Sequence, residues 1–134
     1  MDNHLIIFIK NPVFSNVKKE LDPKSGSKSN LIDFFKLMEH TANISNDISA
    51  SKHLYYDEFI ENDSFFNDQI YAKKIHSSKD PKIQLFEALK EVFGHWAKKV
   101  IFIGTDSLEL EQKDIEHAFD QLDYNDVVIM PEEK

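Results

Sequence analysis

Two uninterrupted apolar runs constrain the fold more than any other feature of this sequence. Residues 5–9 are Leu-Ile-Ile-Phe-Ile and residues 100–103 are Val-Ile-Phe-Ile, and polar residues bound both runs. A strand that is apolar at every position is usually buried on both faces, which is typical of a parallel sheet covered by helices. The two runs therefore predict a layered α/β fold.

Three segments with helical periodicity alternate with the predicted strands. We expect the first helix over Ser29–Asn43, the second from Asp80 to Trp96 and the third over Glu111–Leu122. Asp80 at the cap and Pro81 at the first helical position mark the start of the second helix. The residues expected on the inward face of the second helix are Leu85, Phe86, Leu89, Val92, Phe93 and Trp96.

The remaining predicted strands complete an alternating order of elements. They are Lys52–Tyr56, Gln69–Ile75 and Asp126–Met130. The order β-loop-α-β-β-α-β-α-β favours a three-layer α/β/α domain with a mainly parallel sheet of about five strands. A chain of 134 residues suffices for one domain, which we expect to span residues 1–134.

The charge balance excludes some classes of partner. The formal net charge is −8, and all sixteen basic residues are Lys. A nucleic-acid phosphate backbone or an anionic membrane selects a basic face, so neither is expected as a partner. Local Lys residues can still bind a small phosphorylated ligand, although only as point charges, because Lys lacks the bidentate geometry of Arg. Codon bias accounts for the absence of Arg equally well.

Cysteine content and hydropathy limit the kinds of site that this chain can form and the compartments in which we expect it. The chain has no Cys, which excludes disulfides, thiolate metal sites and Cys nucleophiles. The apolar run near the amino terminus is about five residues long, too short for a signal sequence or a membrane span. We therefore expect a cytoplasmic protein.

The loop after the first predicted strand is the first candidate site. It carries Lys10, Asn11, Pro12, Lys18 and Lys19. Ammonium groups and backbone amides together can cradle a phosphate. A solvated loop that happens to be rich in Lys fits the same pattern.

The loop after the second apolar run is the other candidate site. It has the sequence Gly104-Thr105-Asp106-Ser107. A carboxylate at the end of a strand can hold Mg²⁺ or Mn²⁺ beside a diphosphate, because hard cations bind oxygen ligands. Alternatively, Asp106 or Ser107 caps the turn that follows. Since ligands of parallel α/β sheets bind at the carboxyl ends of strands, both loops are expected to face one crevice.

Other polar residues give weaker signals. The six His residues include no i, i+4 pair, and no zinc motif, nucleophile elbow or Gly-rich phosphate loop occurs. His95 and Trp96 lie at the end of the second predicted helix, where Trp96 is expected in the core. Asp57, Glu58, Glu61 and Asp63 form an acidic cluster that could hold a cation, but a solvated surface explains it better.

Several segments in order resemble one known family. They are residues 5–12, Val17-Lys18, residues 100–106, Ala118-Phe119 with Leu122, and Asp126-Val127-Val128 with Pro131. Together they resemble the selenodomain-associated transferases, glycosyltransferase-A-like relatives of the nucleotide-diphospho-sugar transferases. The resemblance covers nearly the whole chain and is strongest at its two ends.

The resemblance implies a fold, a ligand and a site. The fold would be glycosyltransferase-A-like and Rossmann-like, and the ligand a nucleotide or nucleotide-sugar. Lys10 and Lys18 would face the phosphates, and Asp106 would face a divalent metal or the substrate. The nucleotide-binding set implied in this way is Lys10, Asn11, Pro12, Lys18, Gly104 and Thr105.

The sequence also departs from the family pattern. Glu20 stands where the family has an Arg, Phe14-Ser15 replaces its Pro-Gly pair and Ser107-Leu108 its Cys-Pro pair. The family's acceptor-binding half, which follows Pro131, is not present in this sequence. We therefore expect a transferase-like domain with impaired catalysis, or pseudoenzyme. The alternatives are a non-catalytic relative that acts through protein partners or a homodimer, and a truncated piece of an active enzyme.

Overall fold

Strand pairing is parallel throughout the sheet that the structure describes. The structure is a computed structural model, and it describes residues 2–11, 27–60, 65–105 and 108–125. Its four strands are β1 (Asn3–Ile9), β2 (Ser51–Tyr56), β3 (Tyr71–Ile75) and β4 (Lys99–Ile103). They lie side by side in the order β3-β2-β1-β4. The fifth predicted strand, over 126–130, lies outside the described residues.

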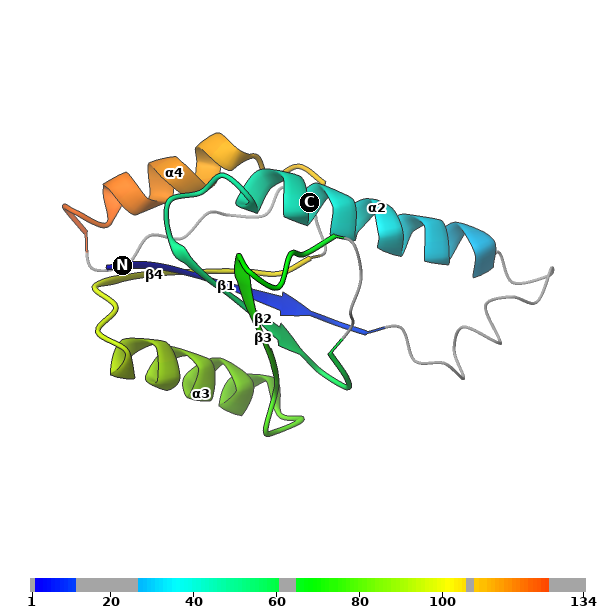
Figure 1. Ribbon diagram of the computed structural model, residues 1–134, viewed down its shortest axis with the longest axis horizontal. Helices are drawn as coiled ribbons and strands as arrows, with labels where there is room; N and C mark the ends of the chain where they lie inside the picture. Colours follow the sequence, from blue (N-terminus) through cyan, green and yellow to red (C-terminus); the bar gives the residue numbers. More distant parts are fainter. Residues whose placement is uncertain (1, 12–26, 61–64, 106–107, 126–134) are drawn as a thin grey trace.

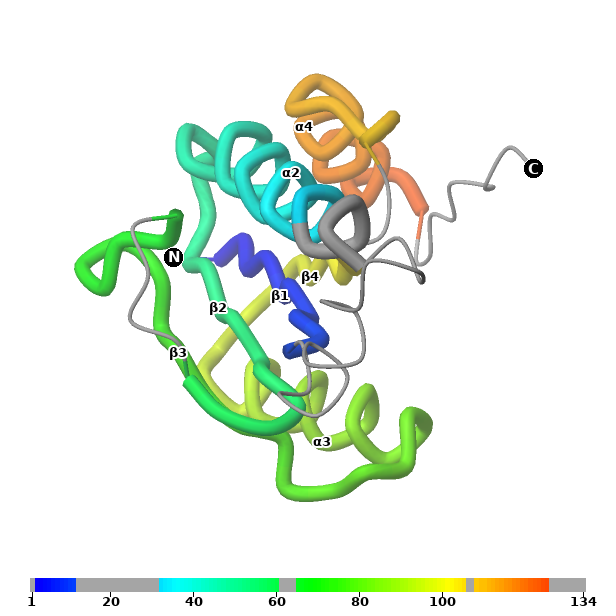
Figure 2. Tube along the Cα trace, turned by 90° about the vertical axis from the view of Figure 1, so that its right-hand side faces the viewer, coloured from blue at the N-terminus to red at the C-terminus, as the bar shows by residue number. Residues whose placement is uncertain are grey.

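Helices cover both faces of the sheet, as the continuous apolar strands predict. The helices are α2 (Ser27–Ser45), α3 (Pro81–Gly94) and α4 (Gln112–Gln121). Figure 1 shows α2 and α4 on one face and α3 on the other, and Figure 2 shows the same three layers from the side. The predicted three-layer α/β/α fold is confirmed. No helix in these described ranges is long and apolar enough to cross a lipid bilayer.

The alternation of side chains along β1 divides the core between the two faces. Leu5 and Ile7 pack with Met38 of α2 in the larger cluster, which also receives Phe119 of α4. Ile6 packs on the other face with Tyr55, Ala88 and Val92. Because successive strand residues point to opposite faces, one apolar run supplies both clusters.

The inward face expected for α3 is partly wrong. Ala88 and Val92 are the residues that α3 buries, and Leu89 packs partly against the same cluster. By contrast, Phe86, Phe93 and Trp96 are exposed. The apolar residues of this helix lie on more than one face. Because we predicted a single inward face, we expected too many of them to contact the sheet.

Candidate functional site

The strand order creates a switch point between β1 and β4. From β1 the chain passes through α2 to β2 on one side, whereas α3 carries it back across the opposite face to β4 on the other side. In open α/β sheets, ligands bind outside the carboxyl ends of the strands at such a point. Lys10 and Asn11 follow β1, and Gly104 and Thr105 follow β4.

Contacts at the carboxyl ends of β1 and β4 show that these residues share one edge of the sheet. Ile7 pairs with Ile103 in the parallel register of β1 and β4. Thr105 donates its hydroxyl Oγ1 to the carbonyl oxygen of Phe8 at 3.4 Å. The two candidate loops therefore begin at the same edge of the sheet. That a ligand crevice lies between them stays a prediction.

Asn11 fastens the loop after β2 to the end of β1. Its backbone amide donates to Oδ1 of Asp57 at 2.7 Å. Its side-chain Oδ1 accepts from the amides of Glu58 at 3.0 Å and Phe59 at 3.1 Å. The Asn11 side chain is buried, so its oxygen serves the protein backbone and orders the acidic loop at this edge. This role was not foreseen, because it depends on a contact between distant parts of the chain.

Lys10 is the cation of the crevice within the described part of the chain. Its side chain is exposed, and it takes part in none of the ion pairs within the described ranges. Three further predicted site residues, Pro12, Lys18 and Asp106, lie outside the described residues.

The acidic cluster does not form a metal site among the residues whose placement is described. Asp57 accepts the Asn11 amide, and Glu58 lies 3.7 Å from the ammonium of Lys79. Glu61 and Asp63 lie outside the described ranges. Within those ranges, no group of three His, Asp or Glu side chains could hold a metal ion.

An aromatic cluster underlies the crevice on the α3 face. The ring of Phe8 makes edge contacts with His76 and Phe102, with centroids 4.3 Å and 4.6 Å apart. His76 also stacks on Tyr55 at 5.3 Å. Burial lowers the pKa of His76, and the charge of the Asp57 carboxylate offsets part of this decrease. His76 is thus a neutral ring beside the crevice, a position that an isolated His in the sequence did not reveal.

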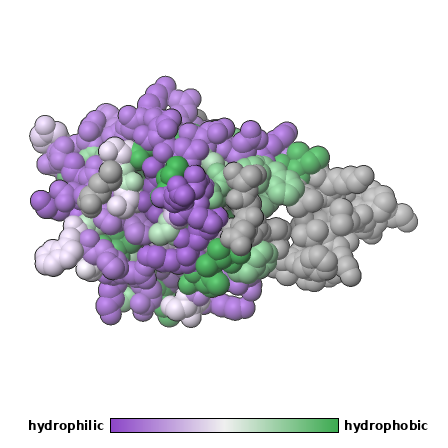
Figure 3. All heavy atoms as spheres, in the orientation of Figure 1, coloured by the Kyte–Doolittle hydropathy of each residue, from purple (hydrophilic) through white to green (hydrophobic). Residues whose placement is uncertain are grey.

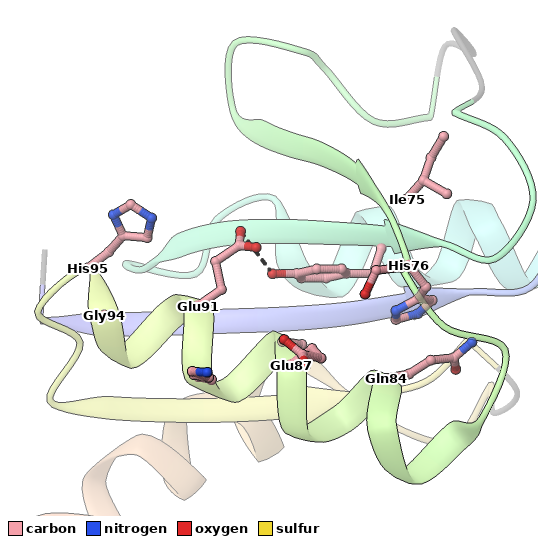
Figure 4. A pocket seen from close by; sticks show the side chains of 11 residues that line it. Ile75, His76, Gln84, Glu87, Glu91, Gly94 and His95 are labelled. Carbon is pink, nitrogen blue, oxygen red and sulfur yellow. Dashed lines mark hydrogen bonds between the residues drawn. The ribbon is translucent and has the colours of Figure 1, made fainter.

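A cavity of about 420 Å³ lies between α3 and the β3 side of the sheet. Figure 4 shows Glu87, Glu91 and Gln84 on the α3 side and His76 at one end, with His95 at the other. The remaining lining residues are Tyr55, Ile75, Ser77, Ala88, Lys90 and Gly94. Its walls are mixed, with carboxylates, an amide and aromatic rings.

A chain of polar contacts runs from this cavity into the sheet. Glu91 accepts from Tyr55 Oη at 3.2 Å and pairs with Lys74. The Lys74 ammonium lies 3.5 Å from Nδ1 of His53, whose Nε2 lies 2.8 Å from Nδ1 of His4. An ammonium can only donate, so Nδ1 of His53 accepts and its Nε2–H donates to His4.

The charge states along this chain follow from burial and neighbours. Burial, with the charge of Lys74 second, lowers the pKa of His53 to about 4. A hydrogen bond from Lys74 lowers the pKa of Glu91 despite its partial burial. Burial raises the pKa of Tyr55. At neutral pH this series of contacts therefore contains the ion pair of Lys74 with Glu91 and a neutral His53 ring.

Comparison with known proteins identifies one matching family and one similar crystal structure. A model of the family described as "Uncharacterized protein conserved in bacteria (DUF2064)" matches residues 41–134. No curated protein matches the chain. A crystal structure described as that of a "putative nucleotide-diphospho-sugar transferase" from Desulfovibrio desulfuricans G20 is similar, with a TM-score of 0.64 at 16% identity. The match covers 92% of this chain but 55% of that protein, and at this identity it shows the fold alone.

Proposed function

The chain belongs to the family described as "Uncharacterized protein conserved in bacteria (DUF2064)", and from this premise we propose that its β1–β4 crevice binds the phosphates of a nucleotide or nucleotide-sugar. The proposed domain is nucleotide-diphospho-sugar transferase-like with impaired catalysis. We also propose that the domain is related to the selenodomain-associated transferases.

One observation carries the proposal, the contact of Thr105, which follows β4, with Phe8 near the end of β1. Because Thr105 donates to the Phe8 carbonyl, the loop after β4 begins beside Lys10. Lys10 supplies an unpaired ammonium within the described residues. Loop amides at the ends of parallel strands can add hydrogen bonds to a phosphate. Together they provide the charge and the donors that a diphosphate needs.

A divalent metal is the part of the proposal that rests on sequence. Asp106 directly follows Thr105 and would be a ligand for Mg²⁺ or Mn²⁺. Such an ion neutralises charge on a diphosphate leaving group. Asp57, at the same edge, already accepts the Asn11 amide. The residues of this chain would therefore bind and orient the diphosphate, with Asp106 as the main candidate ligand.

The departures from the transferase pattern weaken both turnover and phosphate binding. Glu20 places a carboxylate where the family has an Arg that faces phosphate, and repulsion between these like charges opposes binding of the diphosphate as well as its transfer. We expect donor binding with little or no transfer.

The test is thermal unfolding of the purified chain with a panel of nucleoside triphosphates and nucleotide-sugars, with and without Mn²⁺. A ligand at one hundred times its dissociation constant stabilises a fold by about 2.7 kcal/mol. We expect a metal-dependent rise in Tm for the donor class. Lys10→Ala, Lys18→Ala and Asp106→Ala should each reduce this rise.

The matched control is Lys98→Ala, which removes an exposed Lys that precedes β4 and pairs with Asp2, at the opposite edge of the sheet. It should leave the ligand-dependent rise unchanged. A rise that survives Lys10→Ala, Lys18→Ala and Asp106→Ala, or the absence of any rise across the panel, would refute the proposed site.

A further inference from the structure

The outer face of α3 carries large apolar side chains in contact with solvent. Ile83, Phe86 and Phe93 are all exposed, and Phe86 is 63% exposed. With Lys90 they stand at intervals of three, four and three residues. At 3.6 residues per turn, these four positions fall within an arc of about 80°. We call this set, Ile83, Phe86, Lys90 and Phe93, the α3 stripe.

The α3 stripe has the same spacing in both directions along the helix. The intervals of three, four and three residues are symmetric about position 88. If a second copy packs antiparallel with the twofold axis at that level, Ile83 meets the Phe93 of the second copy. Phe86 then meets its Lys90. A twofold interface requires such self-complementarity, in which residue i contacts residue j and j contacts i.

The contacts made in this register are chemically favourable. Each Lys90 ammonium would lie over a Phe86 ring, a cation–π arrangement that occurs twice in the dimer. Ile83 and Phe93 would remove apolar area from water at both ends of the interface. The chemistry of these side chains, as well as their spacing, therefore suits α3 to pack against α3 of a second copy.

The charge distribution also favours this surface for contact between copies. Two chains of net charge −8 repel each other. The α3 stripe contains one Lys and no carboxylate, and its two borders carry Lys82 on one side and Glu87 on the other. Contact through this face therefore opposes fewer like charges than the average surface of the chain.

The end of α3 provides a second, independent observation. Trp96 is 88% exposed and has a φ of 69°, in the left-handed region that bulky residues rarely adopt. A conformation of this kind costs free energy and often marks a functional position. In the antiparallel register, Trp96 lies level with the start of α3 in the second copy, where Lys82 can reach the indole. Gly94, with open space around it, leaves room for that approach.

We propose that the chain forms a homodimer by antiparallel packing of α3 against α3 of a second copy. A helix of 14 residues is about 21 Å long. An interface confined to one such helix falls below about 1,200 Å² of total buried area, the range of transient complexes. The dimer therefore dissociates on dilution.

Sedimentation velocity of the full chain over a range of concentrations tests the proposal. We expect a shift from monomer to dimer as concentration rises. Phe86→Lys places one new ammonium group against each of the two Lys90 side chains and should leave a monomer at every concentration. Ile32→Lys, at another exposed apolar position, on α2, should dimerise like the original chain. Circular dichroism of each variant checks that it is folded.

A compensating substitution tests the register itself. In the double variant Phe86→Lys, Lys90→Glu, each new Lys faces a new Glu across the proposed axis, so dimerisation should return. Failure to recover would overturn the register. A chain that stays monomeric at the highest concentration, or an equal loss of dimer in Ile32→Lys, would overturn the proposal.

The absence of Cys permits a direct cross-linking test. Under mild oxidation, a mixture of the Phe86→Cys and Lys90→Cys chains should form a disulfide-linked dimer several-fold faster than either chain alone. Equal rates would contradict the antiparallel register. This outcome does not depend on nucleotide binding, so the two proposals fail separately.

Discussion

At the scale of single residues, His53 makes the stability of the fold depend on pH. It is buried between His4 and Lys74, and its Nδ1 faces an ammonium that can only donate. Protonation of His53 would place two cations in contact inside the sheet. The ring is therefore neutral in the folded chain at pH values where it is half-protonated in the unfolded chain.

This arrangement predicts acid sensitivity in a defined range. The pKa of His53 is about 4 in the folded chain against 6.5 ordinarily. Between these values the unfolded chain binds more protons, so the free energy of unfolding falls as pH drops from about 6.5 to about 4. The loss is on the order of 3 kcal/mol. Urea unfolding at a series of pH values measures it.

His53→Gln should flatten this dependence, because Gln does not titrate. The control is His117→Gln, an exposed residue of α4, which should leave the slope intact. Glu91 becomes protonated in a separate, lower range of pH, because its pKa is below the usual value for Glu. An unchanged slope in His53→Gln would contradict the explanation.

The positions of the candidate site residues could be predicted from the sequence better than the contacts that they make. Lys10, Asn11, Gly104 and Thr105 were predicted to share one edge, and the contact of Thr105 with Phe8 places them there. The use of the Asn11 oxygen by the amides of Glu58 and Phe59 was not predicted, because a hydrogen bond across 47 positions leaves no local pattern. Whether these residues bind nucleotide stays a prediction.

At the scale of elements, the start of α3 shows how local sequence fixes a boundary. Asp80 has an extended backbone, and its Oδ1 accepts from the Lys82 amide at 2.9 Å. Pro81 occupies the first turn, where a missing amide hydrogen costs nothing. The sequence predicted this cap correctly.

Removal of the cap should destabilise the chain measurably. Asp80→Ala leaves the Lys82 amide without its acceptor, and we expect the free energy of unfolding to fall by about 1 kcal/mol. The control is Asp33→Ala, an exposed carboxylate within α2. Chemical unfolding of both variants checks the difference. Equal effects would show that the cap contributes no more than an ordinary surface Asp.

The elements were more predictable than the faces they present. β1, β2 and β4 were found within one residue or two of the predicted ranges, because continuous apolar runs define buried parallel strands. The predicted first helix was shorter than α2 by two residues at each end. The inward face of α3 was overestimated, because periodicity shows which residues share a side but not which side meets the sheet.

At the scale of the whole molecule, surface charge governs association. The face shown in Figure 3 is mostly hydrophilic, and apolar side chains reach the surface in small groups. With a net charge of −8, each copy repels another at long range. The Debye length falls from about 30 Å at 0.01 M to about 8 Å at 0.15 M ionic strength, so added salt weakens that repulsion.

The proposed dimer should therefore strengthen with salt. Because its contacts are apolar or cation–π, screening of the net charge outweighs screening within the interface. Sedimentation at low and at physiological ionic strength measures the change in dissociation constant. Weaker association at higher salt would show that ion pairs hold the copies together instead.

The central position of β1 has a consequence for biosynthesis. Of the strands that the structure describes, β1 leaves the ribosome first, yet its two neighbours are β2 and β4, and the latter ends at Ile103. Its pairs with β4 join residues roughly a hundred positions apart, and such non-local pairing slows folding. A nascent chain cannot complete this sheet before Ile103 has left the ribosome, so the apolar β1 segment waits for its second neighbour over that whole stretch of synthesis.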